Sequence, residues 1–158
     1  MGQPLDRVLT CYRIGDPEGE HEIFSAEGSR LYPGRWNTRF SPLIYTSEHY
    51  STAMLEKLVH SSGVLPPNQH YVRITIPPPL TYEVFPPEAH SGWDGPRETI
   101  CKTFGEAWFR EKRSVALFVP SIPARLERNI LINPAHSDFN KITWELPQPV
   151  WWDERLYS

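Results

Sequence analysis

The chain has 158 residues, of which 39% are hydrophobic and 13% aromatic, so we expect one globular domain over residues 1–158 and exclude a disordered chain. The formal net charge is −3 with histidine neutral, which argues against a broad basic surface and against direct binding of nucleic acid. Because the sequence lacks a signal-peptide pattern and any window near the roughly 18 apolar residues of a membrane span, we expect a cytoplasmic protein without membrane contact.

The first half of the chain contains two predicted strands and one predicted helix. Residues 9–14 alternate between apolar and polar side chains, and residues 43–46 form a second short strand. A helix is predicted over 48–60, with Ser47 as its N-cap. Its apolar stripe consists of Tyr50, Met54, Leu55, Leu58 and Val59. At about 100° per residue, Glu56 lies well away from that stripe.

The second half adds three strands and one helix. Residues 71–76 form the cleanest strand, and the wholly apolar run 115–119 is typical of a central strand. A further strand is predicted over 129–133. Residues 86–96 are rich in proline and glycine and predict a loop, after which a helix is expected over 97–112. Strands outnumber helices in a mixed order, so the predicted fold class is α+β rather than a doubly wound parallel sheet.

Several common catalytic and binding motifs are missing from the sequence. There is no glycine-rich dinucleotide motif, no Walker-type lysine loop and no Gly-x-Ser-x-Gly elbow. The six histidines and two cysteines show no zinc-ligand spacing, so we expect no metal. Cys11 and Cys101 are too few for a disulfide framework and are predicted to be buried thiols.

Three polar residues on short, closely spaced elements form the first candidate site. Arg35 follows Gly34 in a turn, where a guanidinium is well suited to bind a pyrophosphate. Tyr45 lies in a strand and offers a ring that can stack on a planar base, whereas the structural alternative is packing in the core. Glu56 can stabilise an oxocarbenium-like transition state if its side of the helix lines a cleft. Taken singly, a surface arginine and a solvated glutamate are the commoner outcomes.

Four further residues have weaker signals. Arg13 is the one charge in an apolar strand, and an edge or outward-facing position is slightly favoured. Ser121 follows an apolar strand directly, where sites collect but turn serines are commoner. Asn133 and His136 either cap a turn or bind a ligand, and the turn is favoured.

The order of these residues resembles one family, the RES-domain toxins of type II RES-Xre toxin–antitoxin systems, over roughly residues 9 to 156. The matching segments read YR at 12–13, GRWN at 34–37, LIYTS at 43–47, AMLEKLVH at 53–60, SVALFVPS at 114–121 and NILINPAH at 129–136. Five or six collinear segments are a much stronger signal than any single motif in this chain. Two segments depart from the pattern: residues 16–22 are acidic, and Arg39 stands where a glycine-containing turn is common.

The resemblance implies a fold similar to the ADP-ribosyltransferase (diphtheria-toxin-like) proteins, with a small split β-core and flanking helices. It also implies a toxin that cleaves NAD+ as a consumed substrate, without a separate cofactor. The implied partner is an Xre-like helix-turn-helix antitoxin that covers the active site, with a homodimer of the toxin as a further expectation for the complex.

The resemblance also implies roles for individual residues. Glu56, Arg35, Tyr45 and Ser121 match the family's catalytic set, and Arg13 matches a second arginine for the NAD+ phosphates. Asn133 and His136, from the last segment, are added as NAD+-binding candidates.

Three alternatives stay open. The first is a protein ADP-ribosyltransferase on the same fold, and the second is a non-catalytic nucleotide-binding module. The third is an assembly protein that makes contacts through Trp151 and Trp152.

Overall fold

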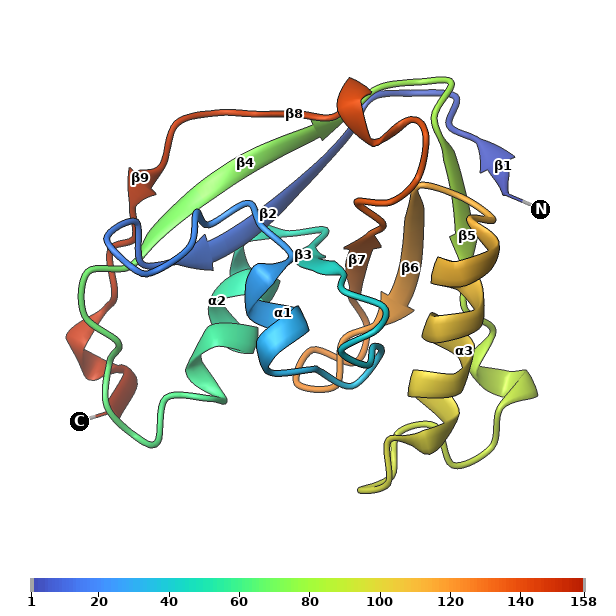
Figure 1. The fold of residues 1–158 in the computed structure, drawn as a ribbon. Helices are drawn as coiled ribbons and strands as arrows, with labels where there is room; N and C mark the ends of the chain where they lie inside the picture. Colours follow the sequence, from blue (N-terminus) through green and yellow to red (C-terminus); the bar gives the residue numbers. More distant parts are fainter. Residues whose placement is uncertain (1, 158) are drawn as a thin grey trace.

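One nine-stranded sheet organises the chain, and the computed structural model describes residues 2–157 of it (Figure 1). The strands are β1 (Gln3–Pro4), β2 (Leu9–Gly15), β3 (Ile44–Ser47), β4 (His70–Ile76), β5 (Thr81–Val84), β6 (Ala116–Pro120), β7 (Arg128–Ile132), β8 (Thr143–Trp144) and β9 (Gln148–Pro149). The α-helices are α1 (Glu27–Leu31), α2 (Tyr50–Leu58) and α3 (Thr99–Glu111), with short 3-10 helices at Pro87–Ala89, Phe139–Lys141 and Glu154–Tyr157. The α+β class is therefore confirmed.

The strand order is β1-β5-β6-β7-β3-β2-β4-β8, with β9 also paired to β4. Within residues 2–157 the β5–β6 pair is parallel and the other pairs are antiparallel. Strand β2 pairs with β4 along its whole length, from Leu9 opposite Ile76 to Gly15 opposite His70. On its other side β2 meets β3 at a single pair, Tyr12 opposite Ser47, so the two strands diverge soon after that point. Such a divergence opens space for side chains between them.

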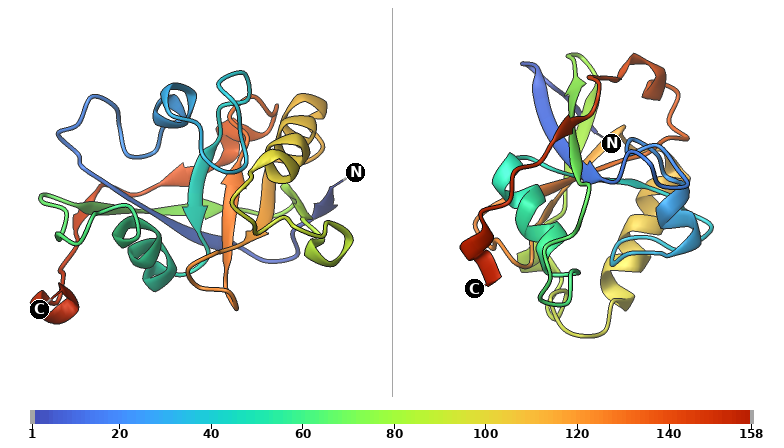
Figure 2. Two further views of the ribbon diagram at one scale, coloured as in Figure 1. Left: turned by 90° about the horizontal axis from the view of Figure 1, so that it is seen from below. Right: turned by 90° about the vertical axis from the view of Figure 1, so that its left-hand side faces the viewer.

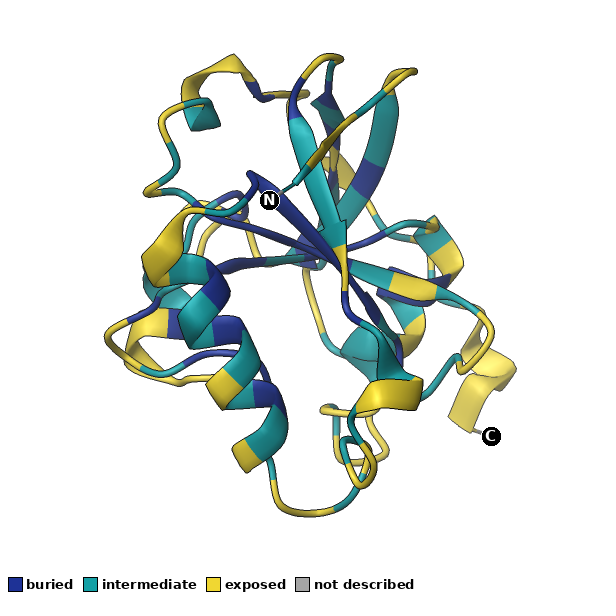
Figure 3. Cartoon of the chain, turned by 90° about the vertical axis from the view of Figure 1, so that its right-hand side faces the viewer, coloured by how far each residue is buried: buried dark blue, intermediate teal, exposed yellow. Residues whose placement is uncertain are grey.

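Apolar side chains cover both faces of the central strands, as the run at 115–119 predicts. In β6, Phe118 faces one apolar cluster together with Ile74 and Ile130, whereas Leu117 faces a second cluster that contains Trp108 of α3. Figure 3 shows buried residues concentrated on the central strands and on the inner side of α3. The two clusters hold the strand ends firmly, and the candidate site lies at those ends.

Helix α3 packs on the sheet through small and aromatic residues, Cys101, Gly105 and Trp108. The indole nitrogen of Trp108 donates to the Ser114 hydroxyl at 2.8 Å, so this large buried ring leaves no unpaired donor. A Cβ added to Gly105 would lie 1.9 Å from the Trp36 carbonyl oxygen. Helix α3 therefore touches the backbone of the loop that carries Arg35.

Two predictions for α2 are wrong. Its N-cap is His49, and Ser47 is instead the last residue of β3, where its hydroxyl donates to Asn129. The predicted apolar stripe is not the buried side either, because Leu55 is 41% and Val59 56% exposed. The helix buries Thr52 and Ala53, which turns the neighbouring Glu56 towards the protein.

The remaining elements follow the sequence only in part. The other predicted strands and the second helix are confirmed, with end points that differ by a residue or two. The predicted loop at 86–96 holds a 3-10 turn, and both cysteines are buried thiols as expected. Helix α1 and strands β1, β5, β8 and β9 were not predicted. The chain ends lie at opposite sides of the molecule (Figures 1 and 2), and no helix within residues 2–157 is long and apolar enough to cross a membrane.

Candidate active site

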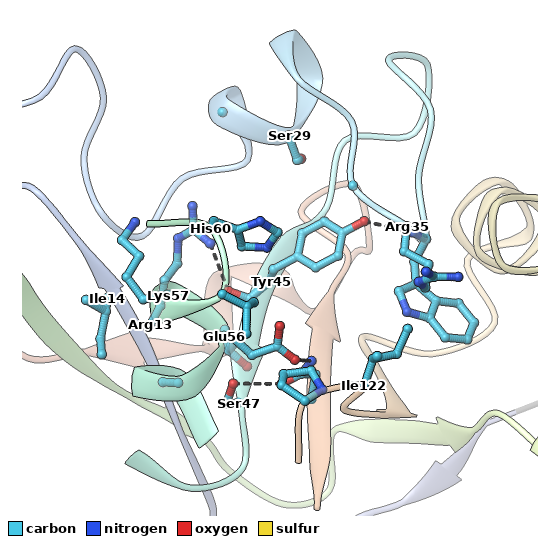
Figure 4. A pocket seen from close by; sticks show the side chains of 18 of the residues that line it. Arg13, Ile14, Ser29, Arg35, Tyr45, Ser47, Glu56, Lys57, His60 and Ile122 are labelled. Carbon is cyan, nitrogen blue, oxygen red and sulfur yellow. Dashed lines mark hydrogen bonds between the residues drawn. The ribbon is translucent and has the colours of Figure 1, made fainter. Parts of the chain in front are cut away.

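A pocket of about 730 Å³ lies where β2 and β3 diverge, between α1, α2 and the loops that follow α1 and β6. Its walls include Arg13, Arg35, Tyr45, Glu56 and Asn129. Figure 4 shows Glu56 and Tyr45 between Arg13 on one side and Arg35 on the other. Four of the predicted site residues thus share one cavity, although they come from separate segments of the chain.

Glu56 is held from behind by two hydrogen bonds to one oxygen. Its Oε2 accepts from the Ser121 hydroxyl at 2.9 Å and from the Asn129 side-chain amide at 2.5 Å. In Figure 4 the other carboxylate oxygen of Glu56 points towards the side of the pocket where the Tyr45 ring lies. A carboxylate fixed in this way presents a negative charge in a defined direction.

Asn129 links Glu56 to the neighbouring strand. It lies in β7 opposite Ser47 of β3, and its Oδ1 accepts from the Ser47 hydroxyl at 2.7 Å. That bond fixes which end of the amide faces Glu56, because only the nitrogen end can donate. The chain Ser47–Asn129–Glu56–Ser121 therefore orients the carboxylate from two sides.

Arg13 faces the pocket rather than solvent, so the favoured expectation of an edge or outward-facing arginine is wrong. Its strand, β2, lies inside the sheet between β3 and β4. The guanidinium donates from Nε to the Ile23 carbonyl at 2.6 Å and from Nη1 to the Tyr45 carbonyl at 2.9 Å. Desolvation by burial lowers the pKa of Arg13 from its ordinary value. An arginine nonetheless stays charged, so Arg13 brings a fixed cation to the pocket wall.

Tyr45 and Asn37 hold the glycine-containing loop at 34–37. The Tyr45 hydroxyl accepts from the Trp36 amide at 3.0 Å and donates to Asn37 Oδ1 at 2.7 Å, and that same oxygen accepts from the Gly34 amide at 2.8 Å. A Cβ at position 34 would lie 2.8 Å from the Tyr45 hydroxyl, which explains the glycine. Burial raises the pKa of Tyr45, so the phenol stays protonated and keeps donating.

Arg35 is fixed to the loop before α3. Its Nη1 donates to the carbonyls of Trp93 and Gly95, both at 3.1 Å. Both N–H groups of Arg35 Nη1 therefore donate to backbone carbonyls, and two N–H groups of Arg13 do the same. Both arginines are held in place before any ligand binds, and such preorganisation lowers the entropic cost of binding an anion.

The other predicted site residues lie outside the pocket wall. Ser121 is fully buried and supports Glu56 from behind. Asn133 is also buried, and its side chain donates to the Phe109 carbonyl and accepts from the Ala135 amide. His136 accepts from the Asp138 amide through Nδ1. The structure thus places Asn133 and His136 in turn-stabilising positions, the alternative that the residue pattern favours.

Sequence reasoning missed several residues of the pocket, among them Asn129, Lys57 and His60. Asn129 carried no signal, because an asparagine at a strand end is ordinary; only its register opposite Ser47 reveals its role. Lys57 has no role assigned from the sequence, yet it lines the pocket. Burial is the first cause that lowers the pKa of Lys57, and the nearby Arg13 charge adds to it. Among residues 2–157 there is no cluster of three or more metal-ligating side chains.

The arrangement suits one kind of chemistry. Cations at both sides can hold an anionic ligand, and a preoriented carboxylate between them can stabilise a developing positive charge. Tyr45 offers ring surface beside the carboxylate. A ligand with phosphate groups and a glycosidic carbon fits these features.

Comparison with known proteins identifies relatives along most of the chain. The family model described as RES domain matches residues 10–153. The chain is 36% identical over 124 residues to the "Prs ADP-ribosylating toxin" of Sphingobium sp. (strain YBL2), covering 75% of this chain and 77% of that protein. It is 32% identical over 139 residues to "Toxin Res" of Photorhabdus laumondii subsp. laumondii, covering 84% and 86%.

A solved structure has the same fold. A chain of the "M.tuberculosis MbcT-MbcA toxin-antitoxin complex" superposes with a TM-score of 0.73, covering 94% of this chain and 86% of that chain. The sequence identity is 17%, so this likeness concerns the fold.

Proposed function

Because the chain belongs to the RES domain family, we propose that it is a toxin that consumes NAD+ by breaking the bond between nicotinamide and ribose. The observation that carries the proposal is Glu56, a carboxylate held by Ser121 and Asn129 with its second oxygen towards the pocket. The relative named an ADP-ribosylating toxin supports NAD+ as the substrate, since ADP-ribose is the part of NAD+ that such a toxin transfers.

The reaction requires little acid catalysis. When the glycosidic bond breaks, its electron pair passes to the pyridinium nitrogen and nicotinamide leaves as a neutral molecule. The positive charge that remains is shared between the anomeric carbon and the ring oxygen of the ribose, where the Glu56 carboxylate stabilises it. Water then forms the new carbon–oxygen bond and releases a proton, which gives ADP-ribose; phosphate as the acceptor gives ADP-ribose 1″-phosphate instead.

The remaining pocket residues have supporting roles in this proposal. Arg13 binds the negatively charged part of NAD+ through donors that are not committed to backbone. Arg35, on the other side of Glu56, holds the loop at 34–37 to the Trp93 and Gly95 carbonyls. The ring of Tyr45 positions the nicotinamide, while its hydroxyl holds the loop at 34–37. Ser121 acts as a positioning residue for Glu56 rather than as a nucleophile, because it lies behind the carboxylate.

The direct test is nicotinamide release from NAD+ by the purified protein. We expect release by the wild type and a loss of about 100-fold or more in kcat for Glu56→Ala, because the carboxylate acts mainly in the transition state. Glu88→Ala is the matched control, since Glu88 is an exposed glutamate outside the pocket. Unchanged turnover in Glu56→Ala would refute the assigned role.

The second candidate is ADP-ribosyl transfer to a protein, which the name of the 36% identical relative favours. It shares the bond-breaking step and differs in the acceptor. Mass spectrometry of a lysate incubated with labelled NAD+ separates the two, because transfer leaves ADP-ribose on a protein whereas hydrolysis leaves it free. Label found only in free products would exclude the transferase.

We also propose a protein antitoxin of the Xre-like helix-turn-helix class that covers the pocket. The solved toxin–antitoxin complex with this fold supports such a partner. Tyr32 and Val59 line the pocket and yet are 83% and 56% exposed, so the rim presents apolar surface. We expect Tyr32→Asp to weaken the complex and relieve inhibition of NAD+ cleavage. Unchanged inhibition would place the partner elsewhere.

A further inference from the structure

A second, smaller pocket of about 340 Å³ adjoins the first. The two pockets share Lys57 and His60, which lie at the end of α2 and just after it. The second pocket is otherwise built by the segment that leads from α2 to β4. Lys57 and His60 therefore lie at the boundary between the two pockets.

The junction between the pockets is cationic. Burial lowers the pKa of Lys57 most, the nearby Arg13 charge lowers it further, and the Asp16 carboxylate raises it. Figure 4 shows Arg13, Lys57 and His60 on the same side of Glu56, away from Arg35. Two cations, Arg13 and Lys57, near each other attract an anionic group more strongly than one does.

The walls of the second pocket are mainly apolar. They include Val64, Leu65, Pro66 and Pro67, with Gln69 at one side. The Gln69 amide donates to the Pro67 carbonyl at 3.0 Å, and the Ser61 hydroxyl donates to the Lys57 carbonyl at 2.8 Å. The first bond lies within the segment, and the second ties its start to the end of α2. Flat apolar walls beside a cationic junction suit an aromatic base attached to a phosphate.

We propose that the second pocket binds the adenosine half of the dinucleotide and that Arg13 and Lys57 hold the pyrophosphate at the junction. NAD+ is elongated, and its parts follow one another as nicotinamide, ribose, pyrophosphate and adenosine. The site offers matching parts in the same order: the Tyr45 ring, Glu56, the cationic junction and the apolar second pocket. The inference rests on the proposed use of NAD+ and adds the direction in which it binds.

The test is direct binding of AMP and of nicotinamide mononucleotide, measured by calorimetry on the purified full-length protein. Leu65→Ser and Val64→Ser each remove apolar wall from the second pocket. Val64 is 68% exposed, so its substitution leaves the fold intact even if Leu65→Ser does not. Leu126→Ser is the control, because Leu126 is fully exposed and lines neither pocket.

We expect the Kd of AMP to rise about threefold to tenfold in the two pocket variants, as removal of a small apolar contact area predicts. The Kd of nicotinamide mononucleotide, which lacks the adenosine half, should change less than about twofold. The control should bind both ligands like the wild type.

Three results would overturn the inference: AMP binding unchanged in both pocket variants, equal weakening of both ligands, or no AMP binding to the wild type at millimolar concentration. These readouts need no turnover. If the protein binds AMP as expected but releases no nicotinamide from NAD+, the proposed function fails while the subsite stands. If the protein cleaves NAD+ and the Kd of AMP is the same in the pocket variants as in the wild type, the subsite is refuted while the proposed function stands.

Discussion

At the scale of single residues, the central feature is a carboxylate whose direction is fixed by its neighbours. Both hydrogen bonds to Glu56 end on Oε2, one from the Asn129 amide and one from the Ser121 hydroxyl. A glutamate on a helix otherwise samples several rotamers, and ordering it in the transition state costs free energy. The supporting donors remove that cost before the ligand arrives.

Substitution of Asn129 tests this arrangement. Asn129→Leu removes the 2.5 Å bond to Glu56, and we expect kcat to fall by about tenfold to 100-fold, the range for a hydrogen bond to a charged group, with a smaller change in KM. Asn140→Leu, at an exposed asparagine in a 3-10 turn, is the matched control. Equal kcat values for Asn129→Leu and wild type would show that the carboxylate needs no such support.

Asn129→Asp provides a readout that a merely structural role would not move. A second carboxylate beside Glu56 repels its negative charge and disfavours the ionised form that the reaction needs. As the solution is acidified, the Asn129→Asp variant should therefore lose activity at a higher pH than the wild type does. An unshifted acid limb in the pH–rate profile would contradict the contact.

The residues of the site were only partly predictable from sequence. Glu56 and Arg35 were individually ambiguous, because exposed charges are ordinary, and only their collinear match to a family raised them. Asn129 became visible through strand register, which a sequence pattern does not contain. Asn133 and His136 follow the end of β7, whereas Asn129, which contacts Glu56, lies near the start of that strand.

At the scale of elements, helix α3 and the loop at 34–37 are fitted to each other through a glycine. Gly105 lies under the Trp36 carbonyl, and Lys102, one turn earlier, donates to the Gly34 and Asn37 carbonyls. Helix α3 thus fixes the position of the loop that carries Arg35. Stability and site geometry are coupled at this contact.

Gly105→Ala tests that coupling. Intrinsic helix propensity alone predicts a gain of about 1 kcal/mol for alanine. The steric clash should reverse the sign and lower the free energy of unfolding by about 1–3 kcal/mol. Gly28→Ala in α1, where an added Cβ meets nothing within 4 Å, should not lower it. Denaturant unfolding of both variants decides the matter, and a more stable Gly105→Ala protein would contradict the contact.

Elements were predictable where hydrophobic periodicity was strong. Strand β4 and helix α3 have clear patterns and were found, whereas α1 is five residues with little apolar character. Its Ser29 hydroxyl donates to the Leu43 carbonyl at 2.6 Å and accepts from the Leu43 amide at 3.0 Å, so tertiary contacts hold it. Helix α2 was predicted, but with the wrong side facing the protein: the side that carries Glu56 faces inwards, and the apolar stripe does not.

At the scale of the whole molecule, the sheet brings distant segments to one cavity. Strand β2 contributes Arg13, β3 contributes Tyr45, α2 contributes Glu56 and β7 contributes Asn129. The order of strands in the sheet places β3 between β7 and β2, so these three strands are neighbours although β7 follows β2 by more than a hundred residues. The α+β class was predictable from sequence; this order was not.

The most direct measurement is NAD+ binding beside single-turnover cleavage for wild type and Glu56→Gln. Glutamine keeps an oxygen that can accept from Ser121 and Asn129 while it removes the charge that stabilises the transition state. We predict a Kd for NAD+ within about threefold of the wild type and a cleavage rate lower by about 100-fold or more. Cleavage at the wild-type rate, or loss of binding without loss of the chemical step, would contradict the role assigned to Glu56.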